Sequence, residues 1–246
     1  MSTIFIGTSG WNYKGWKDSF YKGVSQKKWL MFYSQNFNAV EVNATFYRSL
    51  KSSTYEKWMS ITPDNFWFVI KGTREITHIK RLKKDIESSL LKQKENLAPI
   101  LKKTKAILWQ FPPGFKKDIK LLDNFLTLLR EKWSDHTHIL EFRNKTWFDQ
   151  EVAHKMEEYE IIGNCISDSP KWPMWEITIS NVAYIRLHGH KVLYHSKYSE
   201  NELKEWAEKI KNWSKEGKEV FVFFDNTDSG AAPYDAMELK RILSLN

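Results

Sequence analysis

Short apolar runs recur along the whole chain, and segments with helical periodicity lie between most of them. Eight runs have the length and the β-branched or aromatic content of strands. These runs are residues 3–8, 39–43, 66–71, 105–110, 137–143, 161–166, 182–188 and 219–225. Leu203, Trp206 and Ile210 stand three and four positions apart, a spacing typical of an amphipathic helix. The pattern therefore predicts alternating strands and helices.

Further signals indicate where individual helices run and begin. Apolar stripes with helical spacing also occur within residues 119–129, 152–159 and 239–243. Ser53 and Ser199 are each followed three positions later by Glu, which is the form of a capping box at a helix start. The segment 167–181 contains two prolines, so we expect a loop rather than a regular helix there.

Eight strands, each followed by a helix or a long loop, predict an α/β fold of the TIM-type (β/α)8 barrel class. We expect one domain over residues 1–246, irregular around the sixth strand, because no linker or repeat interrupts the pattern. An open doubly wound sheet is the alternative fold. It has less support, because neither G-x-G-x-x-G nor a Walker sequence follows any of the expected strands.

Alternation within the expected strands predicts which side chains enter the barrel lumen. Successive side chains of a strand point to opposite faces, and one face of a barrel strand is the lumen. In the seventh run, Arg186 and His188 alternate with apolar residues and should therefore point inward. In the last run, we expect Val220, Val222 and Phe224 to point inward. The polar residues predicted at the inward ends are Glu41, Asn43, Lys71, Gln110, Glu141, Arg143, Arg186, His188 and Asn226.

These polar residues should meet at the C-terminal mouth of the barrel, where barrel enzymes keep their active sites. A purely structural ion network is the alternative interpretation. Buried charge is costly unless it is paired or used, and an apolar lumen would be at least as stable. We therefore predict a functional site in which Glu41, Glu141 and His188 carry protons.

The other inward residues suggest what the site would bind. Arg143 and Arg186 suit a planar or tetrahedral anion, and nearby aromatic rings could wall a sugar or a base. For Lys71, we expect a salt bridge to Glu41 rather than a role as a Schiff-base amine. The predicted substrate-binding residues are Asn43, Lys71, Gln110, Arg143, Arg186, Asn226, Trp11, Tyr47, Trp147, His78 and Asp168.

The sequence predicts neither a metal nor a cofactor at this mouth. No H-x-H or H-E-x-x-H spacing is present, and two inward arginines would repel a cation. The loop that holds Trp172 and Trp175 follows the sixth strand, so it is a candidate lid over the mouth. A dimer contact is the alternative role for these two rings.

Charge adds a second candidate partner. The chain has a net charge of +8, and residues 71–120 contain 14 Lys or Arg against 5 Asp or Glu. The basic segments 74–84 and 114–120 should flank the mouth, where they could hold a nucleic-acid backbone. A lysine-rich solvated surface is the simpler interpretation, because Lys greatly outnumbers Arg in this chain.

Composition narrows the class of protein further. Cys165 is the only cysteine, which excludes an internal disulfide, a Cys-rich zinc site and a Cys-ligated iron–sulfur cluster. No apolar run is long enough to span a membrane, and the first residues do not form a secretion signal. We therefore expect a cytoplasmic protein without a membrane partner. The sequence does not indicate an oligomeric state.

Several motifs occur together in one order along nearly the whole chain. They include Gly7-Thr8-Ser9-Gly10-Trp11, Glu41-Val42-Asn43-Ala44-Thr45-Phe46-Tyr47, Gln110-Phe111-Pro112-Pro113, Glu141-Phe142-Arg143 and Arg186-Leu187-His188-Gly189. In these motifs the chain resembles the YecE-like family, also called domain of unknown function 72. The resemblance implies a TIM-type barrel and no particular activity. It is looser near the C-terminus, where Asp225 and Asp235 replace Asn, and it assigns neither residue a role.

The leading functional hypothesis is an enzyme that acts on a small anionic or polyhydroxylated substrate by acid/base chemistry. The reaction class, whether hydrolase, isomerase or lyase, stays open. A nucleic-acid-binding protein like a DNA-repair nuclease is one alternative, and a non-catalytic anion- or metabolite-binding module is another. A glycosidase that uses Glu41 and Glu141 is less favoured, because three nearby cations suit a neutral glycoside poorly.

Overall fold

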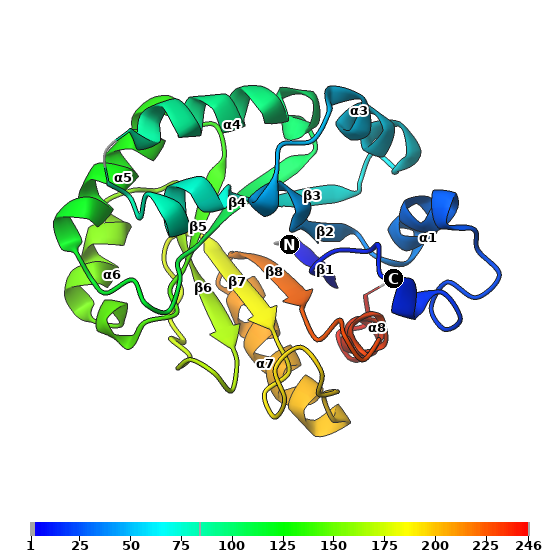
Figure 1. Ribbon diagram of the computed structural model, residues 1–246. Helices are drawn as coiled ribbons and strands as arrows, with labels where there is room; N and C mark the ends of the chain where they lie inside the picture. The colour runs from blue at the N-terminus through cyan, green and yellow to red at the C-terminus, as the bar shows by residue number, and fades with distance from the viewer. Residues whose placement is uncertain (1–2, 84, 246) are drawn as a thin grey trace.

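Eight parallel strands form one sheet that curls into a nearly closed barrel (Figure 1). The computed structural model describes residues 3–83 and 85–245. The strand order is β1-β8-β7-β6-β5-β4-β3-β2, so strands adjacent in sequence are adjacent in space. The strands are β1 (Ile4–Thr8), β2 (Ala39–Val42), β3 (Trp67–Lys71), β4 (Thr104–Gln110), β5 (Thr137–Glu141), β6 (Ile162–Asp168), β7 (Val182–Leu187) and β8 (Glu219–Phe224). The predicted TIM-type barrel is confirmed, and the eight predicted runs coincide with these strands.

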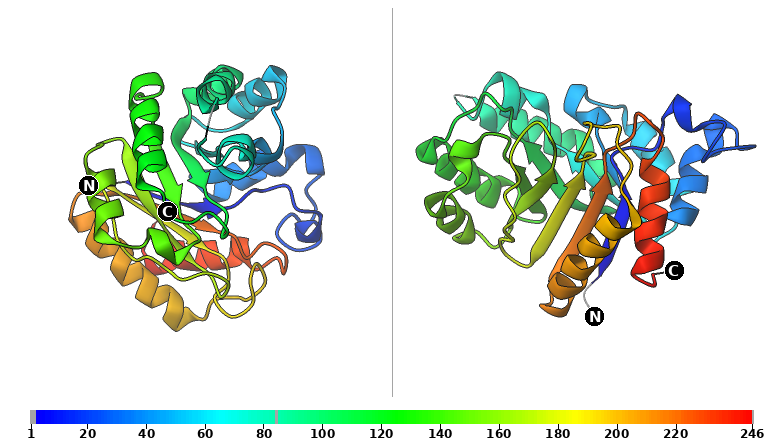
Figure 2. Two further views of the ribbon diagram at one scale, coloured as in Figure 1. Left: turned by 60° about the vertical axis from the view of Figure 1, so that its left-hand side comes forward. Right: turned by 90° about the horizontal axis from the view of Figure 1, so that it is seen from below.

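Helices surround the strands on the outside of the barrel, as the two further views show (Figure 2). They are α1 (Trp29–Asn36), α2 (Ala44–Tyr47), α3 (Ser52–Ile61), α4 (Ile86–Leu101), α5 (Ile119–Lys132), α6 (Gln150–Glu157), α7 (Glu200–Lys215) and α8 (Ala232–Ile242). Between β6 and β7, residues 169–181 contain no helix, so the predicted irregularity is present. None of the helices in the described part of the chain has the length and hydropathy needed to cross a bilayer.

Side chains bridge the one seam where no strand ladder closes the barrel, between β1 and β2. The Asn38 side chain accepts from the Ile6 N–H at 2.9 Å and donates to the Ile4 carbonyl at 2.8 Å. The Tyr33 hydroxyl accepts from the Thr8 N–H at 2.7 Å. Because unpaired buried backbone groups are costly, these bonds stabilise the seam. They keep the C-terminal ends of β1 and β2 beside each other at the mouth.

One of the two predicted capping boxes is correct. The Ser199 side chain accepts from the Glu202 N–H, and the Glu202 carboxylate accepts from the Ser199 N–H, at the start of α7. The box predicted at Ser53 is wrong. The helix α3 begins at Ser52 with Lys51 as its N-cap, so Ser53 lies inside the helix, and the Ser52 hydroxyl donates to the Glu56 carboxylate at 2.7 Å.

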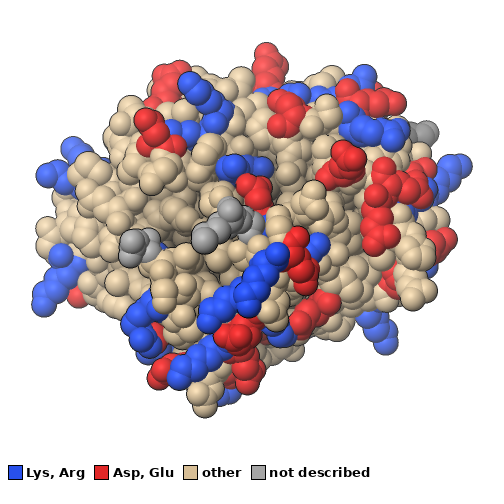
Figure 3. All heavy atoms as spheres, turned by 180° about the vertical axis from the view of Figure 1, so that it is seen from behind, with Lys and Arg blue, Asp and Glu red and all other residues tan. Residues whose placement is uncertain are grey.

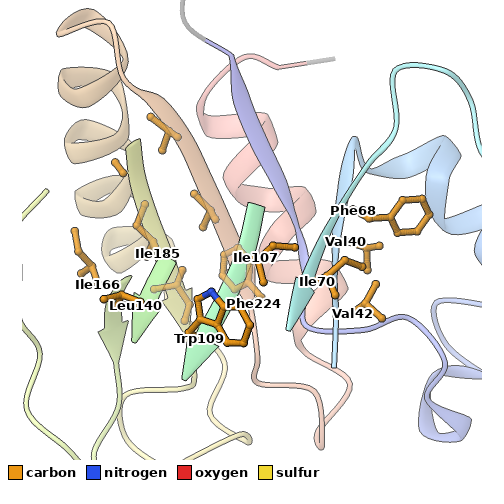
Figure 4. Close-up of a cluster of buried hydrophobic side chains, with 14 of the residues drawn as sticks. Val40, Val42, Phe68, Ile70, Ile107, Trp109, Leu140, Ile166, Ile185 and Phe224 are labelled. Carbon is orange, nitrogen blue, oxygen red and sulfur yellow. The ribbon is translucent and has the colours of Figure 1, made fainter. Parts of the chain in front are cut away.

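The apolar core has two layers, one between strands and helices and one inside the lumen. Figure 4 shows ten labelled residues of the outer layer, among them Val40, Ile107 and Ile185. The lumen layer contains Phe5, Val69, Leu108, Ile139, Tyr184, Phe221 and Phe223. The predicted inward faces of β2, β3, β4, β5 and β7 are therefore confirmed.

The predicted inward face of β8 is wrong. Phe221 and Phe223 fill the lumen, whereas Val220, Val222 and Phe224 pack against the helices. Both faces of this strand are apolar, so alternation of polar and apolar residues carries no information about its orientation.

Candidate functional site

Arg186 lies at the centre of the polar groups in the lumen and is 1% exposed. It extends from β7, and its guanidinium contacts three carboxylates. Nη2 lies 2.7 Å from Glu41 Oε1 and 2.9 Å from Asp225 Oδ2, and Nη1 lies 2.9 Å from Glu141 Oε2. The three carboxylates come from strands β2 and β5 and from the end of β8. Arg186 therefore has carboxylates as its partners, and the predicted role of clamping an external anion is not supported by its position.

Glu41 is fully buried, and both of its carboxylate oxygens accept hydrogen bonds from polar side chains. Oε1 accepts from the Ser9 hydroxyl at 2.8 Å, and Oε2 accepts from the Tyr184 hydroxyl at 2.7 Å. Arg186 contacts both oxygens at once, through Nη2 and Nε. The expected salt bridge between Lys71 and Glu41 is not formed, because Arg186 holds this carboxylate. The sequence reasoning missed Ser9 and Tyr184 as partners in the lumen.

Glu141 bridges the two arginines of the mouth. Its Oε1 accepts from Arg143 Nε at 2.7 Å, and its Oε2 accepts from Arg186 Nη1 at 2.9 Å. Burial by itself would raise the pKa of Glu141. The charges of Arg143, Arg186 and other nearby cations together outweigh burial and hold this pKa well below its usual range. Glu141 is therefore an ionised carboxylate at neutral pH and a weak base.

His188 is fully buried, and its ring contacts define its protonation. Arg186 Nη1 lies 2.9 Å from Nε2, and Arg143 Nη2 lies 3.4 Å from the same atom. Because both guanidinium groups can only donate, Nε2 acts as the acceptor and Nδ1 carries the proton toward the Asp168 carbonyl at 3.1 Å. Burial and then the Arg186 charge hold the pKa of His188 well below its usual range. The ring is therefore neutral.

Asp225 is the acidic residue of the mouth that the sequence reasoning left without a role. It follows β8, its side chain is 12% exposed, and Oδ2 also lies 3.3 Å from His188 Nε2. Burial raises the pKa of Asp225 to about 6, although Arg186 opposes this shift. Sequence alternation assigns the wrong face of β8 to the lumen and therefore predicts that Asn226 points inward. In the structure Asp225, the preceding residue, enters the lumen instead.

Lys71 ends β3 and is a buried cation without a carboxylate partner. The residue is 8% exposed, and within the described chain no carboxylate oxygen lies within 4 Å of its ammonium. Nζ lies 4.6 Å from the centre of the Phe46 ring. Burial and then the charge of Arg186 lower the pKa of Lys71 to about 8. This ammonium therefore carries a charge that the folded chain does not neutralise directly.

His78 and Gln110 lie on the same side of the mouth as Lys71. His78 belongs to η3 (Glu75–Ile79), a single π-helical turn after β3, and such turns are frequent at functional sites. Gln110 Nε2 lies 3.4 Å from His78 Nε2, and the ring packs edge-on against Phe46. Burial and then the charge of Lys71 lower the pKa of His78 to about 4, so this imidazole is neutral as well.

Arg143 connects the two sides of the mouth. Its side chain is 9% exposed, and its Cζ lies 3.8 Å from the centre of the Trp172 ring. Trp172 comes from the 169–181 loop and also packs edge-on against His188 at 5.1 Å. This loop therefore contacts the mouth, as the lid prediction expects. Trp175 of the same loop lies elsewhere and stacks on Phe148.

Four predicted binding residues lie away from these charges. Trp147 is fully buried outside the lumen, where it stacks on Phe142 and donates to the Phe115 carbonyl. Asn226 points outward and donates to Asp235 Oδ2 at 2.8 Å. The side chain of Asp168 accepts from the Tyr198 hydroxyl. Tyr47 on α2 is 69% exposed.

Trp11 and Asn43 line a pocket of about 370 Å³ beside the loops that follow β1 and β2. Trp11 packs edge-on against Trp58, and Arg48 also contributes to the wall. The buried Oδ1 atom of Asn43 has no hydrogen-bond partner within the described residues. The structure therefore places these two predicted residues in a neighbouring hollow rather than in contact with Arg186.

Carboxylates neutralise part of the basic segments near the mouth. Lys80 pairs with Glu75 at 3.0 Å, and Lys117 contacts both Asp149 and Glu151. Lys84 of the first segment lies outside the described residues. Figure 3 shows a different face, seen from behind the view of Figure 1, and there Lys and Arg side chains are also interspersed with Asp and Glu. Nucleic-acid binding by these segments stays a prediction.

The carboxylates of the lumen converge on a guanidinium. Across residues 3–83 and 85–245, no group of three or more His, Cys, Asp or Glu side chains is placed so that it could hold a metal ion. Glu41, Glu141 and Asp225 surround Arg186 instead. What the mouth offers to a ligand is therefore the ammonium of Lys71 and the remaining N–H groups of Arg143.

Known proteins resemble this chain over almost its whole length. A family model described as "Protein of unknown function DUF72" matches residues 5–246. The chain belongs to the DUF72 family. The resemblance to the YecE-like family is thereby confirmed, because the two names denote the same family. The DUF72 description names no substrate and no reaction.

Relatives of this DUF72 chain share its length and fold. The UPF0759 protein YunF of Bacillus subtilis (strain 168) is 29% identical, over 98% of this chain and 95% of that protein. A crystal structure of a DUF72 family protein from Thermotoga maritima MSB8 is 28% identical, with a TM-score of 0.88 over 98% of this chain and 99% of the other. Another, from Enterococcus faecalis V583, has a TM-score of 0.86 at 23% identity, over 99% and 96%. The last of these supports the fold alone.

Proposed function

We propose that this protein is an enzyme that binds a small anionic substrate at the barrel mouth, between Lys71 and Arg143. The observation that carries the proposal is the buried ammonium of Lys71, which has no carboxylate within 4 Å among the described residues. A buried charge is costly unless it is paired. An anionic ligand would supply the missing partner, so the site is complete only when it is occupied.

Strand order supports this position for the anion. β3, β4 and β5 are neighbours, so Lys71, Gln110 and Arg143 project from adjacent strand ends. Glu41 and Asp225 engage Arg186 on the other side of the mouth. Arg143 donates through Nε to Glu141 and through Nη2 to His188, and it also hydrogen-bonds the side chain of Tyr194. Because a guanidinium has five N–H groups, these contacts leave N–H groups for an anion. Positive charge is therefore available on the β3–β5 side.

Two groups in this cluster suit proton transfer at neutral pH. Burial raises the pKa of Asp225 to about 6 and lowers the pKa of Lys71 to about 8. At pH 7 Asp225 is therefore mainly ionised and can accept a proton, while Lys71 is mainly protonated and can donate one. We propose these roles for Asp225 and Lys71. Glu41, Glu141 and His188, which are fully buried, then position the two arginines.

Anion binding tests this function directly. Calorimetric titration with inorganic phosphate and with malonate should show one site per chain that is lost in Lys71→Met. The matched control is Lys103→Met, because Lys103 is as buried as Lys71 but donates to the Thr62 and Pro63 carbonyls at 2.8 and 2.9 Å. Lys103→Met should keep the anion site. The proposal fails if the wild type binds neither anion, or if binding survives in Lys71→Met.

Catalysis needs a second measurement. A panel of phosphorylated metabolites and small carboxylic acids, followed by mass spectrometry, should reveal a substrate that the wild type converts. Asp225→Asn should then lose turnover while it keeps anion binding, because Asp225 is assigned to proton transfer rather than to the anion. Unchanged turnover in Asp225→Asn would contradict this assignment.

A further inference from the structure

Lys71 and Lys103 are the buried lysines among the described residues, and they have opposite surroundings. Lys103 and Lys71 are 7% and 8% exposed. The ammonium of Lys103 is held by the backbone carbonyls of Thr62 and Pro63, which stabilise its charged form. No hydrogen bond to a described residue holds the ammonium of Lys71, and the ring of Phe46 packs beside it. Lys71 is therefore the lysine whose amine can move and lose its proton.

The charges around Lys71 also favour the neutral amine. An amine must be unprotonated to act as a nucleophile, and desolvation or neighbouring cations promote that form. Burial makes the largest contribution to lowering the pKa of Lys71, and the charges of Arg186 and Arg143 lower it further. The carboxylates of Glu141 and Glu41 act in the opposite direction. The result is a pKa of about 8, so roughly a tenth of the amine is neutral at pH 7.

We propose that Lys71 forms a Schiff base through Nζ with the carbonyl carbon of a small anionic carbonyl compound whose acidic group is bound by Arg143. This inference rests on the proposed function, because it uses the same mouth, and it narrows the substrate class to keto acids and phosphorylated aldehydes or ketones. Arg143 suits both acidic groups, because a guanidinium presents a planar fork of donors to a carboxylate or a phosphate.

The proposed step is balanced without an oxidant or a reductant. The neutral amine of Lys71 adds its lone pair to the carbonyl carbon, and the C=O π pair moves to the oxygen. The oxygen then takes up a proton and the nitrogen gives one up, which yields a neutral carbinolamine. The nitrogen lone pair then expels the hydroxyl group, which leaves as water with one further proton. The product is an iminium linked to Lys71, so an ammonium and a carbonyl compound give an iminium and one water molecule.

Reductive trapping tests the inference. The wild-type protein is incubated with pyruvate, with glyceraldehyde 3-phosphate or with neutral acetaldehyde, and each sample is reduced with sodium borohydride. Intact mass spectrometry and peptide mapping should show one adduct per chain, on Lys71, with an anionic probe. Acetaldehyde should label Lys71 at least tenfold less. Pyruvate and glyceraldehyde 3-phosphate distinguish a carboxylate site from a phosphate site.

Protection in the wild-type protein avoids reliance on a variant that could misfold. Inorganic phosphate should suppress labelling of Lys71 and leave labelling of exposed lysines unchanged. The rate of labelling at Lys71 should rise through pH 8, about two pH units below the rise for exposed lysines. Lys71→Arg should abolish the adduct, whereas Lys103→Arg should retain it.

The possible failures are distinct. If phosphate binds and Lys71→Met removes that binding, but neither anionic probe labels Lys71, the Schiff base is wrong and the anion site stands. If phosphate and malonate do not bind and no probe labels Lys71, the proposed function fails together with this inference. Equal labelling of Lys71 and the exposed lysines by all three probes also overturns the Schiff base.

Discussion

Arg186 and Glu41 form a two-point ion pair across the barrel lumen, with Nη2 2.7 Å from Oε1 and Nε 3.0 Å from Oε2. The pair connects β7 with β2, which are not neighbours in the sheet. Both residues are almost completely excluded from water, at 1% and 0% exposure. Such a pair is a weak stabiliser as a whole, but removal of one member leaves a buried charge without its partner.

Replacement of Arg186 should therefore be strongly destabilising. Arg186→Met would leave three carboxylates without their shared cationic partner, because the guanidinium contacts Glu41, Glu141 and Asp225. We expect the free energy of unfolding to fall by about 3–5 kcal/mol, the usual cost of breaking a buried ion pair from one side. Urea denaturation followed by circular dichroism measures this loss.

Arg241→Met is the matched control for Arg186→Met. Arg241 is also paired with a carboxylate, that of Glu238 at 2.6 Å, but its side chain is 65% exposed. Surface pairs contribute little, so the unfolding midpoint of this variant should stay close to that of the wild type. Equal losses in the two variants would contradict the special role given to the buried guanidinium.

Replacement of Lys71 should have the opposite effect on stability. Its pKa is lowered from 10.5 to about 8 in the folded protein, so burial of the ammonium opposes folding below pH 8. Lys71→Met removes that penalty, and we expect a gain of about 1–3 kcal/mol at pH 7. As pH rises from 8 toward 10.5, the wild type should recover stability and the difference should shrink. Urea denaturation across this pH range checks the prediction.

Lys103→Met supplies the contrast for this stability measurement. Its ammonium donates to backbone carbonyls, and these would lose their partner in the variant. The variant should be less stable than the wild type at pH 7. A loss of stability in Lys71→Met would show that Lys71 contributes to folding, and the case for an unpaired functional amine would weaken.

Sequence pattern predicted the fold and most of the mouth, because polar and apolar residues alternate clearly in several strands. Arg186 in β7 and His188 directly after it alternate with apolar residues that pack against the helices, and the structure places both in the lumen. β8 carries no such contrast. Its apolar residues fill both faces, so alternation does not show that Asp225 enters the lumen while Asn226 points outward.

The pairing of charges within the mouth could not be predicted in the same way. Strand position shows that Lys71, Glu41 and Arg186 approach one another, but it does not show which cation each carboxylate contacts. That choice depends on side-chain reach and on competing donors. Ser9 and Tyr184 fix the orientation of Glu41 toward Arg186. Alternation in the seventh run places Tyr184 on the same face as Arg186, but it does not indicate that Tyr184 or Ser9 contacts Glu41.

Anion binding should weaken as pH rises through about 8. The proposed anion partner is the protonated form of Lys71, whose pKa is about 8 in the unliganded protein. A bound anion stabilises the ammonium, so the midpoint of the loss in the complex should lie above 8. Phosphate and malonate affinities measured calorimetrically from pH 6 to 10 test this. An affinity that is flat over this range excludes Lys71 as the anion partner.

Asp225 should make the pH dependence of stability unusual for an acid. Its pKa is raised from 3.8 to about 6 by burial, so its stabilising contribution is present below 3.8 and is lost as pH rises through 6. The stability of the wild type relative to Asp225→Asn should therefore fall between about pH 4 and pH 6. Asp228→Asn, which removes an exposed carboxylate from the next loop, is the control for a change in net charge alone. If the stability of the wild type relative to Asp225→Asn rises over this pH range, the pKa of Asp225 is lowered by folding and not raised.

Trp172 should control how well Arg143 holds an anion. Its ring lies 3.8 Å from the Arg143 guanidinium carbon, and its Nε1 donates to Ser167 Oγ at 2.9 Å. Trp172→Ala removes the surface on which the guanidinium stacks, so phosphate affinity should fall by about two- to fivefold, as expected for a lost cation–π contact. Trp175→Ala is the control from the same loop, because Trp175 stacks on Phe148 instead. Equal changes in both variants would indicate a general effect of the loop, whereas a change confined to Trp172→Ala assigns the effect to Arg143.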